Sequence, residues 1–197
     1  GIDVSKWQQD IDWQKVAEDG VEFAILRMGY QNGFDGEISI DPYFEKNVKG
    51  CMENNIPISV YLSSYAKTAT EAKSQADWIC GKLKEYNYGN VNISFDWENW
   101  NSFNKLGLSL NDINNMADIF MDECVNQGYN AMLYGSKTYL EAVWKNEKNY
   151  PVWLANYVDE TSYSGNYKVW QFSQTGIVSG VKGKVDINVM YENSSNL

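Results

Sequence analysis

The sequence predicts an α/β protein that closes into an irregular TIM-like barrel, with five βα units followed by three further strands. Eight short apolar runs recur along the 197 residues, and helical patterns separate only the first six of these runs. Alternating strands and helices are typical of a parallel sheet, and eight strands are enough to close one into a barrel. A doubly wound open sheet is the alternative topology. Because no repeat or linker divides the chain, we expect residues 1–197 to form a single domain.

The expected strands are short runs rich in β-branched and aromatic residues, bounded by turn-forming residues. They are residues 2–4, 23–27, 58–63, 92–96, 131–134, 152–155, 168–172 and 185–189. The expected helices lie between them, at residues 12–20, 41–52, 70–83 and 109–128, with a shorter helix after Ser136. Asp41-Pro42 and Ser109 are typical of helix starts, and Gly20 and Gly128 are typical of helix ends.

The composition excludes several classes of function. A formal net charge of −10 without any basic run argues against nucleic acid as a partner. No apolar run is long enough to insert into a membrane, and no signal peptide is present. The chain starts at Gly1 instead of methionine, as an excised or processed module would, so the absent signal says little about the full-length protein.

The chain contains no histidine, which removes Ser-His-Asp and Cys-His nucleophilic sites and H-E-x-x-H zinc sites. Cys51, Cys80 and Cys124 are widely spaced in helical patterns and are expected to be buried without a disulfide framework or metal site. We therefore expect no metal and no cofactor. Any catalysis must use carboxylates, tyrosines or lysines.

One segment combines an apolar strand with two acids. Residues 91–98 read VNISFDWE, and alternation along a strand turns Asp96 and Glu98 to one side and Trp97 to the other. Repulsion between two neighbouring carboxylates tends to keep one of them protonated near neutral pH. A proton donor beside an ionised carboxylate is what cleavage of a glycosidic bond requires. Acidic residues are also common at solvated strand ends, so this motif needs support from the rest of the chain.

Further candidates lie where reactive groups gather in a βα barrel, at the carboxyl ends of the strands. Asp3 and Asp186 lie between apolar neighbours, and the two strands that carry them become adjacent if the barrel closes. A buried carboxylate is costly unless it is hydrogen-bonded or functional, so four acids at one barrel mouth indicate a site. The candidates for substrate contacts are Arg27, Tyr61, Tyr134, Trp153, Tyr157 and Gln171. Flat aromatic rings suit the apolar faces of sugars, although each ring could equally serve barrel packing.

The sequence resembles the glycoside hydrolase family 25 lysozymes along nearly its whole length and in the same order. The resemblance is carried by residues 3–8 (DVSKWQ), 11–13, 23–27, 41–44 with Asn47, 56–61, 96–98, Tyr134, 153–155 with Tyr157, 170–173, 176–183 and 185–188. It implies a barrel of five βα units and three further strands, with the family's four acidic positions at Asp3, Asp96, Glu98 and Asp186. One departure is Tyr61-Leu62, where members often have an aromatic-histidine pair.

This resemblance implies an N-acetylmuramidase that cuts the β-1,4 bond of the bacterial peptidoglycan glycan strand with net retention, with Glu98 as general acid and base. It implies action at the bacterial cell wall, either extracellular or phage-delivered, as in an endolysin or autolysin. A separate wall-binding domain could follow in the full-length protein. Two alternatives are the same chemistry on a chitin-type polymer and a non-catalytic wall-binding module on the same fold.

Overall fold

The computed structural model describes residues 1–191 and shows a mixed α/β fold, with an eight-stranded barrel and one extra strand. The strands are β1 (Ile2–Val4), β2 (Ala24–Gln31), β3 (Ile38–Ile40), β4 (Ile58–Ser63), β5 (Asn92–Asp96), β6 (Asn130–Ser136), β7 (Val152–Ala155), β8 (Val169–Gly176) and β9 (Val185–Met190). The helices are η1 (Lys6–Gln8), α1 (Trp13–Glu18), α2 (Phe44–Glu53), α3 (Ala69–Glu85), η2 (Trp100–Ser102), α4 (Phe103–Leu106), α5 (Leu110–Asn126) and α6 (Lys137–Ala142).

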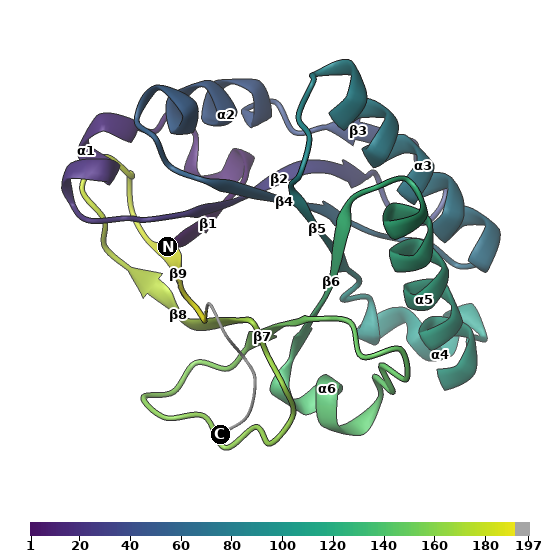
Figure 1. The fold of residues 1–197 in the computed structure, drawn as a ribbon. Helices are drawn as coiled ribbons and strands as arrows, with labels where there is room; N and C mark the ends of the chain where they lie inside the picture. Colours follow the sequence, from purple (N-terminus) through teal and green to yellow (C-terminus); the bar gives the residue numbers. More distant parts are fainter. Residues whose placement is uncertain (192–197) are drawn as a thin grey trace.

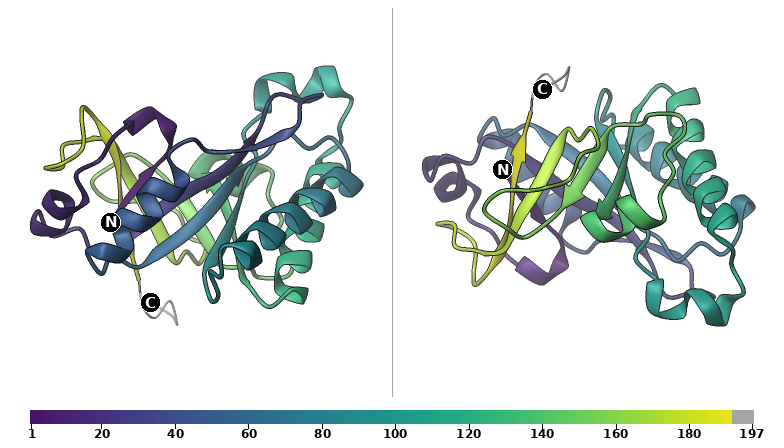
Figure 2. Two further views of the ribbon diagram at one scale, coloured as in Figure 1. Left: turned by 90° about the horizontal axis from the view of Figure 1, so that it is seen from above. Right: turned by 90° about the horizontal axis from the view of Figure 1, so that it is seen from below.

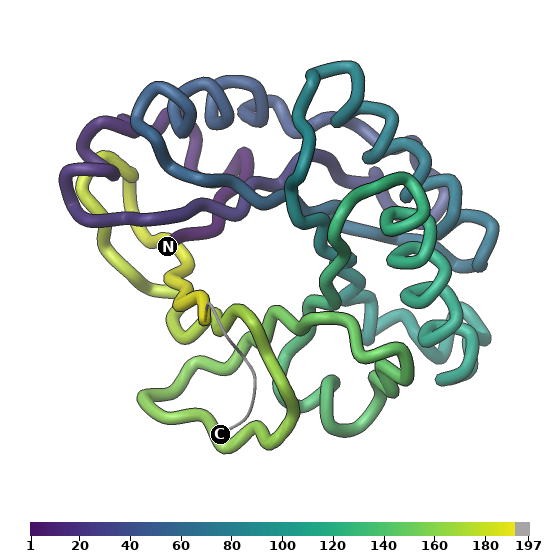
Figure 3. Tube along the Cα trace, viewed as in Figure 1, coloured from purple at the N-terminus to yellow at the C-terminus, as the bar shows by residue number. Residues whose placement is uncertain are grey.

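The barrel closes through β1, which pairs with β2 on one side and with β9 on the other. Strands β1, β2, β4, β5, β6, β7 and β8 run parallel, and β9 is antiparallel to both of its neighbours. Figure 1 shows this ring of strands with helices α2, α3 and α5 outside it, and Figure 3 shows the last strand beside the first. The closed ring excludes the open doubly wound sheet.

The expected order of five βα units followed by three strands is confirmed, and four of the eight strand ranges match at both ends. The extra strand β3 was not expected. It pairs with the outer half of β2, which continues past Arg27 through a bulge to Gln31. Figure 2 shows this β2–β3 ribbon extending beyond the neighbouring strands. The three residues of β3 are only half-buried and pair with β2 alone, so they lack the run of buried apolar residues that marks the expected strands.

Two helix starts illustrate how local chemistry sets the bounds. Ser109 caps α5 as expected and forms a reciprocal capping box with Asp112. The start of α2 differs from the expectation, because Tyr43 is the N-cap residue and the helix begins at Phe44. The Asp41 carboxylate still accepts a hydrogen bond from the Tyr43 amide, at 3.0 Å, so Asp41 organises the turn before the helix.

The apolar core has two parts. The larger part lies between the strands and the surrounding helices, and it includes the three cysteines, which are buried and free. The smaller part fills the barrel interior and consists of Ile25, Met132, Tyr134, Trp153, Ala155 and Val169. Because side chains fill the interior, a ligand site in such a barrel is expected at the ends of the strands. Within residues 1–191, no helix is long and apolar enough to cross a membrane.

Helices α1 and α2 approach closely at Gly50. A Cβ atom added there would lie 2.1 Å from Cδ1 of Trp13, whose indole N–H donates to the Asn47 side-chain oxygen at 3.3 Å. The helical Gly81 of α3 has no atom within 4 Å of the corresponding position. These two glycines differ in the space around them, although both lie within helices.

We expect Gly50→Ala to lower the free energy of unfolding by about 1–3 kcal/mol, because the new methyl group overpacks against Trp13. Gly81→Ala is the matched control and should raise the free energy of unfolding by about 0.5–1 kcal/mol, since alanine costs less backbone entropy in a helix. Urea unfolding followed by circular dichroism measures both values. Equal effects of the two substitutions would contradict the close approach at Gly50.

Candidate active site

The closure of the barrel brings two acids from opposite ends of the chain together. Asp3 of β1 and Asp186 of β9 are directly opposed in the antiparallel register, and their carboxyl groups lie within hydrogen-bonding reach of each other. Asp3 is buried, and this burial together with the Asp186 charge raises the pKa of Asp3 to about 7. Burial also raises the pKa of Asp186. The two carboxyl groups therefore share a proton at mildly acidic pH.

Two amide side chains hold the Asp3 carboxyl group in place. Gln171 of β8 and Asn188 of β9 each donate a side-chain N–H to Oδ2 of Asp3, at 2.8 and 2.9 Å. These hydrogen bonds partly offset the effect of burial on the pKa of Asp3. Asn188 was not among the expected site residues. Its position two residues after Asp186, on the same face of a strand, is the signal that could have identified it.

The second acid pair lies at the end of β5. Asp96 is the last residue of the strand and is buried, whereas Glu98 is exposed at the mouth of the pocket. Trp97 between them faces the core and donates its indole N–H to the Ala66 carbonyl at 2.9 Å. The expected alternation is therefore observed, and both carboxyl groups line the same hollow.

The surroundings of Asp96 and Glu98 favour the retention of one proton by this pair of carboxyl groups. Burial raises the pKa of Asp96 well above its usual value, and the charge of Glu98 raises it further. Burial also raises the pKa of Glu98; a hydrogen bond with Asp96 partly opposes this effect, and the Asp186 charge adds to it. The two carboxyl groups lie close enough to share a proton, so that proton belongs to the pair and is held to higher pH than on an isolated acid.

Aromatic and amide side chains extend the site over β6, β7 and β8. The hydroxyl groups of Tyr134 and Tyr157 donate to Oε1 of Gln171, at 3.2 and 2.9 Å, and Gln171 in turn holds Asp3. Burial raises the pKa of Tyr134 well above its usual value and that of Tyr157 to about 12, so both remain neutral donors. Tyr157 is 45% exposed and can contact a ligand.

Trp153 and Tyr61 line the floor of the site. Trp153 is almost fully buried and donates its indole N–H to Oδ1 of Asn188 at 2.8 Å. Its ring packs edge-on against Tyr61, with ring centroids 5.7 Å apart. The structure thus gives Trp153 a role in barrel packing and in fixing Asn188, and leaves it little surface on which a sugar could stack.

Arg27 lies on the other side of the acids and is paired with a carboxylate of its own. Its Nε donates to Oδ2 of Asp41 at 2.8 Å, and its Nη2 lies 2.7 Å from the same oxygen. The guanidinium charge lowers the pKa of Asp96, which opposes the effect of burial. Arg27 therefore acts on the acids mainly through its charge, because its hydrogen bonds go to Asp41.

All ten expected site residues line two adjoining hollows at the carboxyl ends of the strands. One hollow of about 200 Å³ contains Tyr134, Trp153, Tyr157 and Gln171. The other, of about 220 Å³, contains Trp7, Gln8, Arg27 and Ser63. Both share Asp3, Tyr61, Asp96, Glu98 and Asp186. The acids thus lie where the two hollows meet.

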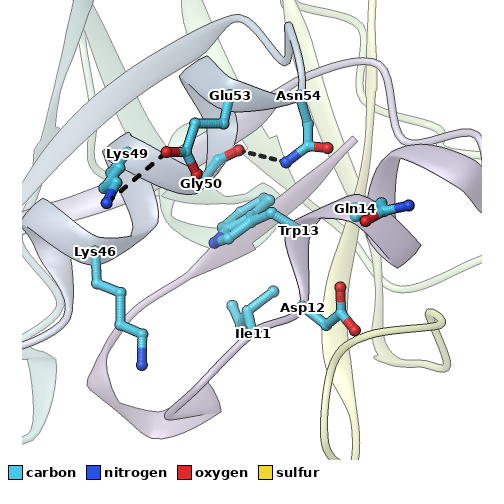
Figure 4. Close-up of a pocket in the computed structure, with 9 residues that line it drawn as sticks. All are labelled: Ile11, Asp12, Trp13, Gln14, Lys46, Lys49, Gly50, Glu53 and Asn54. Atoms are coloured by element: carbon cyan, nitrogen blue, oxygen red, sulfur yellow. Dashed lines mark hydrogen bonds and ion pairs between the residues drawn. The ribbon is translucent and has the colours of Figure 1, made fainter.

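A larger hollow of about 480 Å³ lies elsewhere, between α1 and α2 (Figure 4). None of the ten expected residues lines it. Its charged groups are paired with one another or with nearby residues, Lys49 with Glu53 and Lys46 with Asp10, and Asn54 donates to the Gly50 carbonyl. The charged side chains that line this groove therefore form surface ion pairs, and they do not bring a set of reactive groups together. Across residues 1–191, no group of three or more His, Cys, Asp or Glu side chains is arranged to hold a metal ion.

A match to the family model described as "Glycosyl hydrolases family 25" covers residues 2–181. The chain therefore belongs to glycosyl hydrolase family 25, and the resemblance seen in the sequence is confirmed. Membership of this family makes the protein a glycoside hydrolase, which agrees with the acids found at the strand ends.

Individual proteins are similar to this chain in sequence or in fold. The chain is 28% identical over 195 residues to the uncharacterized Escherichia coli protein YegX, covering 96% of this chain and 68% of YegX. It is 24% identical over 194 residues to the autolytic lysozyme of Clostridium acetobutylicum, covering 98% and 56%. The spore cortex lytic enzyme SleM of Clostridium perfringens shares the fold, with a TM-score of 0.80, 20% identity and coverage of 98% and 67%.

The raised pKa of Asp3 makes stability depend on pH. Between about pH 4 and 7, Asp3 is ionised in the unfolded chain but protonated in the folded protein, so the free energy of unfolding falls as pH rises. Asp3→Asn cannot ionise and still accepts from Gln171 and Asn188. We therefore expect the stability of Asp3→Asn relative to the wild type to be higher at about pH 8 than at about pH 4.

Denaturant unfolding at both pH values measures this difference, and Asp10→Asn is the control. The pKa of the exposed Asp10 is lowered by its pairing with Lys46. The stability that this pairing contributes is present above the ordinary pKa of an aspartate, about 4, and is lost mainly below it. Asp10→Asn should therefore show nearly the same stability relative to the wild type at both pH values. The same relative stability of Asp3→Asn at both pH values would show that Asp3 is ionised in the folded protein.

Proposed function

We propose that this protein is a lysozyme of the N-acetylmuramidase type, which cuts the β-1,4 bond between N-acetylmuramic acid and N-acetylglucosamine in bacterial peptidoglycan. The observation that supports it most is the coupled Asp96–Glu98 pair at the junction of two hollows in a family 25 barrel. The similarity to an autolytic lysozyme and to a spore cortex lytic enzyme favours peptidoglycan over other glycans.

Glu98 is proposed as the general acid and base. It is the more exposed member of the pair, so it can reach the glycosidic oxygen of a bound glycan. It donates its proton to that oxygen as the bond to the anomeric carbon breaks, and the bonding electron pair leaves with the oxygen. Its carboxylate then takes a proton from the water that attacks the anomeric carbon, which restores the acid.

Asp96 is proposed to stabilise the positive charge that develops at the anomeric carbon. Two routes lead to net retention: Asp96 attacks the carbon directly, or it orients and stabilises the acetamido group of the substrate while that group attacks. Asp3 and Asp186 are proposed to position the sugar and the acid pair. Tyr61, Tyr134, Tyr157 and Gln171 supply hydroxyl, amide and ring contacts.

The proposed location is the bacterial cell wall, reached either by secretion or by delivery from a phage. We propose that residues 1–197 form one catalytic domain and that a separate wall-binding domain belongs to the full-length protein. The partial coverage of YegX and of the autolytic lysozyme fits this arrangement, because both proteins are longer than the matched region.

The test is digestion of purified peptidoglycan and of chitin, with measurement of new reducing ends and mass analysis of the products. Cleavage as proposed leaves N-acetylmuramic acid at each reducing end of the peptidoglycan fragments. Turnover of chitin in preference to peptidoglycan would favour the alternative substrate. The anomeric form of the first product, followed by nuclear magnetic resonance, tests net retention.

We expect Glu98→Gln to reduce turnover by about 10²–10⁴-fold, because it removes the transferable proton and keeps the shape of the side chain. Circular dichroism and thermal unfolding should be close to those of the wild type. Near-wild-type hydrolysis by a folded Glu98→Gln protein would remove Glu98 from the mechanism.

The pH profile tests the coupling between the acids. Loss of the last proton from the pair places two charges side by side, whereas in Asp96→Asn the same step creates only one charge. The pH–activity profile of the wild type should be bell-shaped. Asp96→Asn should lower the activity and move the high-pH side (basic limb) of this profile to lower pH. Glu147→Gln, an exposed change before β7 at a residue that lines neither hollow, also removes one charge and should leave the high-pH side of the profile in place. An unmoved basic limb in Asp96→Asn would mean that the two acids titrate independently.

A further inference from the structure

Trp7 lies beside the acids with its indole ring in solvent. It is 74% exposed, whereas each of the other seven tryptophans is buried or half-buried. A large aromatic ring kept in water forgoes the favourable free energy that its burial would bring. An exposed ring at the edge of an active site is therefore a candidate for contact with a ligand.

The turn that carries Trp7 is held rigidly. In η1, the Ser5 amide donates to Oε1 of Gln8 at 2.9 Å, and Oγ of Ser5 accepts from the Trp7 amide at 3.4 Å. The Lys6 amide donates to Oδ2 of Asp41 at 2.9 Å, the oxygen that also pairs with Arg27. Because Ser5 and Asp41 are buried, the turn is anchored to the barrel, and binding on Trp7 costs little ordering of the backbone.

A lysine positions the ring itself. The Nζ atom of Lys6 lies 5.3 Å from the centroid of the Trp7 ring and 4.2 Å from that of the Tyr30 ring. An ammonium group over an aromatic face is attracted by the ring electrons, which stabilises this orientation. The exposed fraction of Trp7 shows that the rest of the ring stays open.

Trp7 lines the hollow that adjoins the one containing Tyr134 and Tyr157, and both hollows share the four acids. A polymer cut at the acids must continue on both sides of the broken bond. One side has the tyrosines and Gln171, and the other has Trp7 together with Ser5, Gln8 and Ser63. A flat ring surrounded by hydroxyl and amide groups matches a sugar, whose ring has an apolar face and a polar edge.

We propose that Trp7 forms the binding surface for the sugar ring next to the one bound among Tyr134, Tyr157 and the acids. This inference rests on the proposed function, because it assumes that the substrate is a glycan strand. In this arrangement the hollow around Trp7 binds a second sugar of the strand. Trp7 then increases the affinity of the protein for substrates longer than one sugar.

The test is calorimetric titration in the Glu98→Gln background, so that the glycan stays intact. The probe is a soluble tetrasaccharide of alternating N-acetylglucosamine and N-acetylmuramic acid. Adding Trp7→Ala should weaken binding by about five- to tenfold, the range expected for loss of one aromatic stacking contact. Adding Trp7→Phe should restore most of the affinity, because the flat ring returns.

Ile177→Ala is the matched control. Ile177 is 77% exposed and lines neither hollow, so its loss should leave the affinity unchanged. In the active background, Trp7→Ala should raise KM for glycan strands by a similar factor, with a smaller change in kcat. Thermal unfolding should remain near that of the wild type, since the ring contributes little burial.

The outcomes separate this inference from the proposed function. If the wild type releases no reducing ends from peptidoglycan, the lysozyme assignment is wrong. If the wild type is active and Trp7→Ala binds the tetrasaccharide as tightly as its parent, the assignment of Trp7 is wrong and the lysozyme assignment stands. Equal weakening by Trp7→Ala and Ile177→Ala would also overturn it, because the effect would not be specific to the ring beside the acids.

Discussion

The antiparallel pairing of β9 with β1 is the contact on which the rest of the site depends. It closes the barrel, places Asp186 opposite Asp3, and brings Asn188 within 2.9 Å of the Asp3 carboxylate. Without it, β1 would lie at the edge of an open sheet and its acid would face solvent. The closure therefore creates the fold and the buried acidic floor of the pocket at the same time.

Burial of these acids sets the chemistry and has a cost in stability. A carboxylate removed from water is stable only if hydrogen bonds or a retained proton compensate for the lost hydration. In this protein both compensations occur, since two amides donate to Asp3 and the pairs Asp3–Asp186 and Asp96–Glu98 each hold a proton to raised pH. A site of this kind is expected to destabilise the fold while it supplies a proton donor.

The neutral polar groups around the acids form a connected chain. Tyr134 and Tyr157 donate to Gln171, Gln171 donates to Asp3, and Asn188 links Asp3 to the indole of Trp153. Such a connected chain restricts the rotamers of its members, which is what positions an active site before the substrate arrives. The side around Trp7 is more open and is organised differently. There Ser5 caps η1, and the Lys6 amide ties this turn to Asp41, which also pairs with Arg27.

Much of the fold and of the acidic site could be predicted from the sequence, because the deciding signals are local. Alternation along residues 92–98 turns Asp96 and Glu98 to one side of the strand, and the order of βα units directs strand ends to one mouth. The absence of histidine left carboxylates, tyrosines and lysines as the groups available for catalysis. Motifs that occur along nearly the whole chain, in the same order as in the family 25 lysozymes, then indicated the family.

The tertiary structure alone decided the features that depend on contacts between distant residues. The pairing of Asp3 with Asp186 and Asn188, the burial of Trp153 and the exposure of Trp7 follow from how the barrel closes. So does the short strand β3, which exists only because β2 offers it an edge. Sequence patterns report the periodicity of one segment, whereas register, burial and shared protons are set by partners that can lie more than a hundred residues away.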